Sequence, residues 1–354
     1  MVIDRYITSS VVKGVLIASM VMAALFGFIS FVGELDQIGT AKYNLVKALF
    51  YVALTLPQQL YELAPSIILL GGLISLGAMA AGSELVVMRA SGITAMRIVR
   101  SVMQTGLILA IFVALGGEYF VPVASSKGKS IRAHALDQRL LASGQHGFWA
   151  RDNMRYVHAR RVMPEKKLGD VSVYEIDKDR QLVRITRASR AEYSNGQWNL
   201  FDVVHSHLSE DTVSSETISR EVWPELIRPR LFAVLRLAPE DMSAQDLYAY
   251  GRYLEKNGLD AVEYQLAFWI KLFTPLTCLA MLLIAMPMVF NATPRSGGTG
   301  QRVIAGLLLG IIFFVLNRAA NHLGVVYNVP PFISAIVPLL VITSIAILLL
   351  RKVR

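Results

Sequence analysis

The stretch GVLIASMVMAALFGFISFVG, residues 14–33, contains no charged side chain and lies between Lys13 and Glu34. A helix needs about 20 mostly apolar residues to cross roughly 30 Å of hydrocarbon, so this stretch is long enough to span a bilayer. It is too long for the apolar core of a signal peptide, and no small-residue cleavage site follows it. We therefore expect it to be retained as the first of several membrane spans.

Five further stretches resemble the first, and together they define the fold class. The uncharged stretches are residues 14–33, 63–83, 101–117, 272–294, 303–317 and 319–350. Residues 48–61 extend the second stretch upstream, and the turn signal Asn328-Val329-Pro330-Pro331 divides the region after residue 303 into two spans. The sequence thus predicts an α-helical integral membrane protein with six transmembrane helices, three on each side of a polar block.

The composition agrees with this interpretation. The chain is 54% hydrophobic and 17% charged, whereas a soluble domain is about 45–50% apolar and about 25% charged. Residues 127–263 hold 21 Lys/Arg and 20 Asp/Glu, so +8 of the net charge of +9 belongs to the apolar flanks. A nucleic-acid binder would concentrate its basic residues on a soluble domain, so we expect no nucleic-acid partner.

The positions of Lys and Arg in the short loops predict the orientation. One side of the membrane holds Arg5, Lys13, Arg89, Arg97, Arg100, Arg295, Arg302, Arg351, Lys352 and Arg354. The other side holds Lys42 and Lys47, which Glu34 and Asp36 offset. Since cytoplasmic loops carry the excess of positive charge, both termini are expected in the cytoplasm and the polar block outside it.

The polar block reads as strands separated by turns. Residues 156–159, 171–176 and 182–186 alternate or are β-branched, and turn signals occur at 177–179, 194–196 and 208–211. We expect one antiparallel sandwich or an open, jelly-roll-like sheet pair in residues 124–240. A helix from Ser243 to about Lys256 then forms a connector, residues 241–262, between this all-β domain and the spans of residues 263–354.

The loop at residues 82–100 is expected to form a short amphipathic helix at the cytoplasmic surface. Ser83 is positioned to cap it, and a break follows at Ser91-Gly92. Such a helix can rest on lipid or dock into a cytoplasmic partner. Glu84 favours docking, because a carboxylate is poorly matched to an anionic inner leaflet.

Motifs for catalysis, nucleotide binding and metal binding do not occur in the sequence. The glycine-rich residues 296–302 lack the phosphate-binding lysine of a P-loop. The pair His205 and His207 shares a strand face without a third ligand, and a single cysteine, Cys278, excludes Cys-based metal sites. We expect no cofactor, and an energy source outside this chain.

Two ionisable residues near the spans suggest function, because charges at membrane depth are costly. Arg318, followed by Asn321 and His322, is expected to line a polar cavity. Sixteen residues from Arg302 at about 1.5 Å each place it roughly 24 Å across the membrane, near the outer headgroups. Glu62, near the start of the second span, is expected to lie at an interface.

Four segments resemble one known family. They are Asp4-Arg5-Tyr6-Ile7, SELVVMRASG at residues 83–92, Gly147-Phe148-Trp149-Ala150, and Tyr264-Gln265-Leu266. These segments resemble the LptF/LptG family, the permeases of the bacterial lipopolysaccharide export transporter, and residues 84–92 are more similar to the LptG branch. The resemblance covers essentially the whole chain.

The resemblance implies a non-catalytic permease subunit in the inner membrane of a Gram-negative bacterium. A separate cytoplasmic ABC ATPase dimer would drive it, and a homologous LptF-like permease would pair with it. Lipopolysaccharide would leave the outer leaflet through a cavity between the permeases. It would then pass along the periplasmic β-jelly-roll towards a single-span LptC-like protein and a soluble LptA-like bridge protein.

The resemblance also implies site residues, and residues 83–97 would be the coupling helix. The residues expected to couple to the ATPase are Glu84, Leu85, Met88, Arg89, Ser91 and Gly92. Those expected at the cavity and its gate are Leu25, Phe26, Ile29, Ser30, Ile311, Phe313, Phe314, Leu316 and Arg318. Close relatives often carry lysines at the outer end of the first span, where this chain has Ser30, Glu34, Asp36 and Gln37. The candidates for binding headgroup phosphates are therefore Lys42, Lys47, Arg132 and Arg318, or the partner permease.

Other functions remain as alternatives. A transmembrane sensor would need a cytoplasmic output domain, and no cytoplasmic segment here exceeds about 20 residues, the length that a single span requires. A secondary transporter favours internal repeats, and the two halves show none. An assembly scaffold needs only the large extracytoplasmic domain.

Overall fold

The computed structural model describes residues 2–136, 148–152, 155–163, 167–177, 181–194, 197–208, 213–223, 238–290, 299–327 and 329–351. Some of the predicted features lie outside these residues. They are Gly147, the turns at 178–179, 195–196 and 209–211, Arg295, residues 296–298, Asn328, Lys352 and Arg354.

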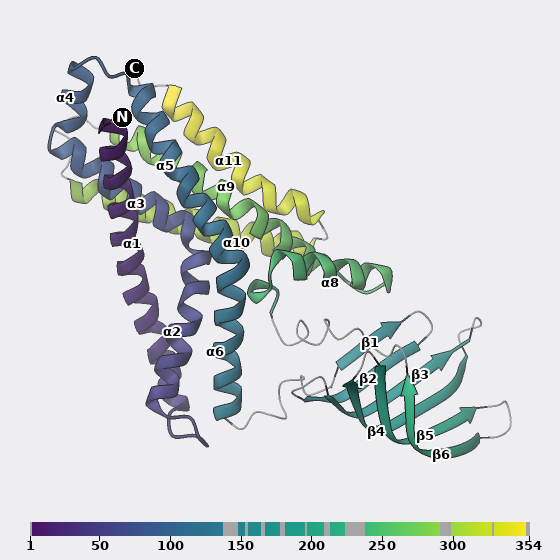
Figure 1. Cartoon of the computed structure of the whole chain (residues 1–354). Coiled ribbons are helices and arrows are strands. Elements are labelled where there is room, and N and C mark those ends of the chain that lie inside the picture. Colours follow the sequence, from purple (N-terminus) through teal and green to yellow (C-terminus); the bar gives the residue numbers. More distant parts are fainter. Residues whose placement is uncertain are drawn as a thin grey trace.

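Six helices in the described part of the chain are long and apolar enough to cross a membrane, which confirms the six predicted spans. They are formed by α1 (Val2–Glu34), α3 (Ala64–Ala81), α5 (Ala95–Leu115), α9 (Val262–Phe290), α10 (Thr299–Val326) and α11 (Pro331–Arg351). The start of α1, the end of α11 and the short helix α4 (Glu84–Ala90) lie at one end of the bundle, here called the terminal end (Figure 1). The β-strands lie beyond the opposite end, here called the sheet end (Figure 1).

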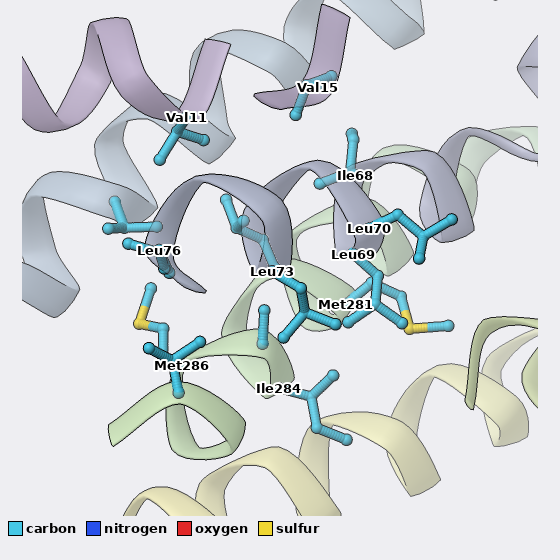
Figure 2. Packing of buried hydrophobic residues seen from close by; sticks show 14 of the residues in the cluster. Val11, Val15, Ile68, Leu69, Leu70, Leu73, Leu76, Met281, Ile284 and Met286 are labelled. Carbon is cyan, nitrogen blue, oxygen red and sulfur yellow. The ribbon is translucent and has the colours of Figure 1, made fainter. Parts of the chain in front are cut away.

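The helix α3 forms the centre of the bundle. Its residues are apolar on every side, as expected of a helix that is buried all round, and 14 of its 18 residues are buried. Figure 2 shows Val11 and Val15 of α1 on one side of α3 and Met281 and Ile284 of α9 on the other. The helix α10 also packs on α3, so three spans are positioned by this one helix.

The contact between α1 and α3 depends on glycine. A Cβ atom added at Gly14 would lie 2.3 Å from the carbonyl oxygen of Gly71, and one added at Gly71 would lie 2.4 Å from the Cα of Val15. Both distances are far below van der Waals contact. The two backbones therefore approach each other as closely as small residues allow, which is a common way for membrane helices to associate.

One predicted boundary differs from the structure. Residues 48–61 do not extend the second span but lie in a separate helix, α2 (Leu45–Glu62), which ends before α3 begins at Ala64. Pro65 explains the break, because proline has no N–H group to donate to the Tyr61 carbonyl and its ring clashes with that carbonyl in a continuous helix. The helix α2 packs on α6 (Val121–Ala135), which continues α5 through a π-helical turn, η2 (Gly116–Phe120).

The residues between the third and fourth spans form an antiparallel sheet, which confirms the inserted β domain. The strands are β1 (Phe148–Asp152), β2 (Arg155–Met163), β3 (Lys167–Ile176), β4 (Leu182–Ser194), β5 (Gln197–Leu208) and β6 (Val213–Trp223). Each described strand pairs with the next in the chain, so the sheet order is β1 to β6. The expected second sheet of a sandwich or sheet pair is not present among these strands, because every one of them belongs to this single meander.

One face of the sheet is apolar. Trp198, Leu200 and Val203 of β5 are fully buried, together with Val157 of β2 and Val173 of β3. The pair His205 and His207 lies on one face of β5, and the two residues differ in burial. His205 is buried and its Nδ1 lies 2.9 Å from the Thr186 hydroxyl, while His207 is more exposed, with its ring centre 6.4 Å from that of His205.

The connector begins with a short 3-10 turn, η4 (Pro239–Asp241), and continues as α8 (Ala244–Lys256), the helix expected after Ser243. The Ser243 hydroxyl accepts a hydrogen bond from the Asp246 N–H, 3.1 Å, and so caps the helix. The Glu118 carboxylate of η2 accepts a second one from the Ala244 N–H, 2.7 Å. Lys271 of α9 donates to the Met242 carbonyl, so two spans hold the connector.

The glycine contact at the centre gives a stability prediction. We expect Gly14→Ala to lower the melting temperature of the purified protein in detergent, because its methyl group would overlap the Gly71 backbone. Gly33→Ala is the matched control in the same helix, since a Cβ there meets no atom within 4 Å. Ala is the better helix former by about 1 kcal/mol, so this control should melt no lower than the parent. Equal melting temperatures for the two variants would contradict the proposed role of the contact.

Candidate functional site

A polar pocket lies at the sheet end of the bundle, between α1, α2 and α6. Its volume is about 360 Å³, and Ser30, Gly33, Glu34, Tyr51, Thr55, Gln58, Gln59, Glu62 and Lys129 line it. Gln59 Nε2 donates a hydrogen bond to Ser30 Oγ, 2.8 Å, which joins α1 to α2 across the pocket. Hydroxyl, amide, carboxylate and ammonium groups therefore meet in one place, next to apolar helix surfaces.

The carboxylate of Glu34 forms a largely buried ionic contact in this region. Arg132 Nε of α6 lies 2.8 Å from Glu34 Oε2, and the Tyr43 hydroxyl donates to the same oxygen, 3.0 Å. The Arg132 guanidinium also lies over the Tyr51 ring, 5.5 Å from its centre. Burial raises the pKa of Tyr43 above its ordinary value, and its hydrogen bond to Glu34 raises the pKa further. Tyr43 therefore keeps its proton and donates a hydrogen bond to the Glu34 carboxylate.

A second ionic contact joins the pocket to the connector. Asp241 of η4 is fully buried, pairs with Lys129 and accepts a hydrogen bond from the Ser125 hydroxyl, 2.6 Å. The same hydroxyl lies 2.8 Å from Gln58 Oε1 of α2. The chain that leaves the β domain is thus fixed to the helices that form the pocket.

The four predicted phosphate ligands do not gather at one point. The Lys42 N–H donates to the Ala135 carbonyl at the end of α6, 2.9 Å, and Lys47 Nζ donates to the Lys42 carbonyl, 2.7 Å. These two lysines therefore lie near the same end of α6 that carries Arg132. Arg318 lies exposed on α10 and interacts electrostatically with Glu62 at the end of α2.

The predicted gate residues form exposed apolar surfaces on α1 and α10. Leu25 and Ile29 of α1 are 52% and 54% exposed, and Ile311 and Leu316 of α10 are 51% and 63% exposed. The phenylalanines behave differently, because Phe26, Phe313 and Phe314 pack partly against the core. Within this chain, nothing covers the exposed faces of either helix in the part that the structure describes. Both faces are suited to lipid or to another membrane helix.

The short helix α4 forms at the terminal end, but its predicted cap is wrong. Ser83 takes a left-handed conformation, with φ of 58°, and its side chain makes no capping hydrogen bond. The helix is fixed instead from α1, whose Tyr6 hydroxyl donates to Glu84 Oε2, 2.8 Å. The break predicted at Ser91-Gly92 is present, and Gly92 has φ of 87°.

The coupling residues predicted on α4 divide into two groups. Leu85 is buried and Met88 packs against the core, so both hold the helix to the bundle. Arg89, Ser91 and Gly92 are exposed. The apolar surface of α4 is formed by Val86 and Val87, 62% and 61% exposed, with Met96 of α5 67% exposed nearby in the sequence.

Several residues of these sites were not singled out from the sequence. Tyr51, Gln58 and Gln59 lie in α2, whose apolar composition suggested only a membrane span. Lys129 is one of many charges in the polar block, and its partner Asp241 lies 112 residues away. Val87 could have been identified, because a seven-residue helix that buries Leu85 and Met88 exposes the residues between them.

The Lys129–Asp241 pair gives a prediction about the connector. Lys129→Met leaves the buried Asp241 carboxylate without its cation, and we expect a loss of roughly 1–3 kcal/mol in stability, less than for a fully buried pair because Lys129 is partly exposed. Thermal unfolding in detergent measures it, with Lys127→Met as the exposed control two residues away. The double variant Lys129→Met/Asp241→Asn should recover part of the loss. A single variant as stable as its control would show that the pair does not hold the connector.

Known proteins match this chain over nearly its whole length. The family model described as lipopolysaccharide export system permease LptF/LptG matches residues 5–352. The chain is 33% identical over 353 residues to the lipopolysaccharide export system permease protein LptG of Haemophilus influenzae, covering 99% of this chain and 98% of the relative. It is 34% identical over 341 residues to the protein of the same name from Escherichia coli K12, covering 95% and 94% of the two chains.

Proposed function

Since the chain belongs to the LptF/LptG family of lipopolysaccharide export permeases, we propose that it is the LptG-type subunit of an ATP-driven extractor. In this role it takes lipopolysaccharide from the outer leaflet of the inner membrane and passes it to its own β domain. The exposed apolar faces of α1 and α10 are the observation that carries the proposal. An acylated substrate needs such a wall, with cationic groups at headgroup depth.

The proposed orientation places the terminal end in the cytoplasm and the β domain in the periplasm. Ten short-loop Lys and Arg residues on one side against two on the other support it. The arrangement in Figure 1 is consistent with this orientation, because α4, the start of α1 and the end of α11 share one end of the bundle. Lipopolysaccharide then travels from α1 and α10 towards the sheet.

The proposed energy source is a cytoplasmic ABC ATPase dimer that docks on α4. The exposed Val86 and Val87 offer it an apolar surface, and Glu84 lies at the start of the same helix. The hydrogen bond between Glu84 and Tyr6 links this docking surface to α1. A movement of the ATPase would therefore be transmitted to α1 through this hydrogen bond and not through the hydrophobic core.

The remaining partners follow from the surfaces that this chain leaves uncovered. A homologous LptF-like permease would face α1 and α10 and complete the cavity, with Lys42, Lys47, Arg132 and Arg318 contributing positive charge. The β domain would pass lipopolysaccharide on towards a single-span LptC-like protein and a soluble LptA-like protein. The chain itself would remain a non-catalytic subunit.

The alternative function, a scaffold or sensor without a transport role, is tested by reconstitution. The complex purified with its ATPase should release lipopolysaccharide from proteoliposomes to a periplasmic acceptor in the presence of ATP. Release should disappear when this chain is omitted. Undiminished release without this chain would contradict the proposed function.

Coupling gives a specific prediction at Glu84. We expect Glu84→Arg to weaken association with the ATPase and to lower export, because the charge at the docking surface is reversed. Because Glu84 also accepts a hydrogen bond from Tyr6, Tyr6→Phe is the variant that separates the two roles. It removes the internal bond alone, so ATPase association in a pull-down should stay normal. Normal association and export in Glu84→Arg would exclude this docking surface.

Headgroup recognition gives a prediction at Arg318. We expect Arg318→Ala to reduce photo-crosslinking of lipopolysaccharide while the protein level stays unchanged. Arg318→Lys should restore crosslinking only in part, because lysine cannot bind a phosphate through two parallel hydrogen bonds. If Arg318 instead braces neighbouring helices, Arg318→Ala will lower thermal stability or complex assembly, and crosslinking per assembled complex will be unchanged.

A further inference from the structure

The sheet-end half of α1 is held differently from the rest of the helix. The buried residues of its first half are Ile7, Val11, Gly14, Val15 and Ala18. In the whole described length of α1, the next buried residue is Glu34, at its last position. The apolar residues between, such as Leu25 and Phe28, are more than half exposed. Apolar packing therefore fixes the first half of α1 near α3 and α5, whereas its far end is held by polar contacts together with the partly buried Phe31, which packs on Tyr43, Ala48 and Ala135.

Those polar contacts are few and specific. Gln59 of α2 donates to Ser30, and one turn further Glu34 accepts from Arg132 and Tyr43. Glu34 is 8% exposed, so its carboxylate is removed from water and depends on these two donors. Releasing Glu34 would leave the sheet-end half of α1 without its buried anchor.

The donors that hold Glu34 are also suited to another anion. A guanidinium recognises carboxylate and phosphate through the same geometry, and a phosphate offers more acceptor oxygens and more charge. Arg132 is 28% exposed at its side chain, beside the pocket that Glu34 and Lys129 line. An anionic group that enters this pocket meets Arg132 already engaged with an internal carboxylate.

We propose that Glu34 occupies the place of a substrate phosphate on Arg132, and that a phosphate of lipopolysaccharide displaces it and frees the sheet-end half of α1. The proposal rests on the proposed function and names a selection step within it. Glu34 is a positioning residue, which competes with the ligand and does not bind it. A glycolipid without phosphate leaves the Glu34–Arg132 pair intact and leaves α1 in place.

Competition between Glu34 and the phosphate predicts the direction in which the affinity for the ligand changes. Each molecule of phosphorylated ligand must replace an existing ionic contact, so Glu34 lowers its apparent affinity. Removing the charge of Glu34 should raise that affinity and should also loosen α1 before any ligand is present. The ion pair between Asp241 and Lys129 should stay unchanged in such a variant, because neither residue pairs with Glu34.

The test compares Glu34→Gln with Asp36→Asn in the complete complex with its ATPase and partner permease. Asp36 is exposed and lies two residues further along, so its variant makes the same charge change without touching Arg132. The probes are lipopolysaccharide and the same preparation after chemical removal of its phosphates. We expect Glu34→Gln to bind the phosphorylated form at least about threefold more tightly, and Asp36→Asn to bind it as the parent does.

The position of α1 is read by spin labels at Val32→Cys and Val123→Cys, in a background where the buried Cys278 is replaced by alanine. These labels report the distance between α1 and α6. In the parent, phosphorylated lipopolysaccharide should lengthen or broaden it and the dephosphorylated form should not. In Glu34→Gln the distance should be broad without ligand.

The variant Arg132→Lys distinguishes the proposal from a merely structural role of the pair. Under the proposal, this variant keeps the charge and should bind phosphorylated lipopolysaccharide more weakly, with little change for the dephosphorylated form. If Glu34→Gln fails to assemble, Arg132→Lys and the parent's response to the two probes still decide the question. Equal binding and equal distances with both probes would overturn the inference alone, whereas a parent complex that binds neither probe would overturn the proposed function with it.

Discussion

The close approach of α1 to α3 at Gly14 and Gly71 is the contact on which the rest of the bundle depends. Lipid tails are as apolar as leucine, so helices in a membrane gain stability from close packing and not from leaving water. The helix α3 can accept neighbours on all sides because its faces are uniformly apolar and carry glycine where a backbone must approach. With α1 fixed there, its other half exposes residues such as Leu25 and Phe28 to lipid or to a partner.

The sequence was sufficient for much of this architecture. The six spans were predictable because an uncharged stretch of about 20 residues has few alternatives to a membrane helix. The strands β2, β3 and β4 were predictable from alternation or β-branched residues, and α8 from its Ser243 cap. The separation of α2 from α3 was missed because an apolar stretch does not reveal a break of one residue at Leu63. The Ser83 cap failed because this residue has a left-handed conformation, and the Tyr6 hydroxyl holds the start of the helix at Glu84 instead.

The candidate site was less predictable, and distance along the chain explains why. Glu34 and Arg132 are 98 residues apart, and a sequence shows charges without their partners. Arg132 was predicted as a phosphate ligand, and the structure shows it engaged with a carboxylate. The sequence shows that these segments of α1 and α10 are apolar, and their role as a cavity wall stays a prediction. The division into exposed residues such as Leu25 and Leu316 and partly core-packed ones such as Phe26 required the packing.

The connector carries a consequence for how such proteins diversify. Its contacts come from the bundle itself, since Glu118, Lys129 and Lys271 hold Ala244, Asp241 and Met242. The direction in which the chain re-enters the membrane is therefore set by residues outside the β domain. The strands can change in sequence, length or even origin while this junction stays the same. This freedom ends at the core cluster that contains Trp198 and Leu200 of β5 together with Leu247 and Tyr250 of α8, because those positions share one core with the connector.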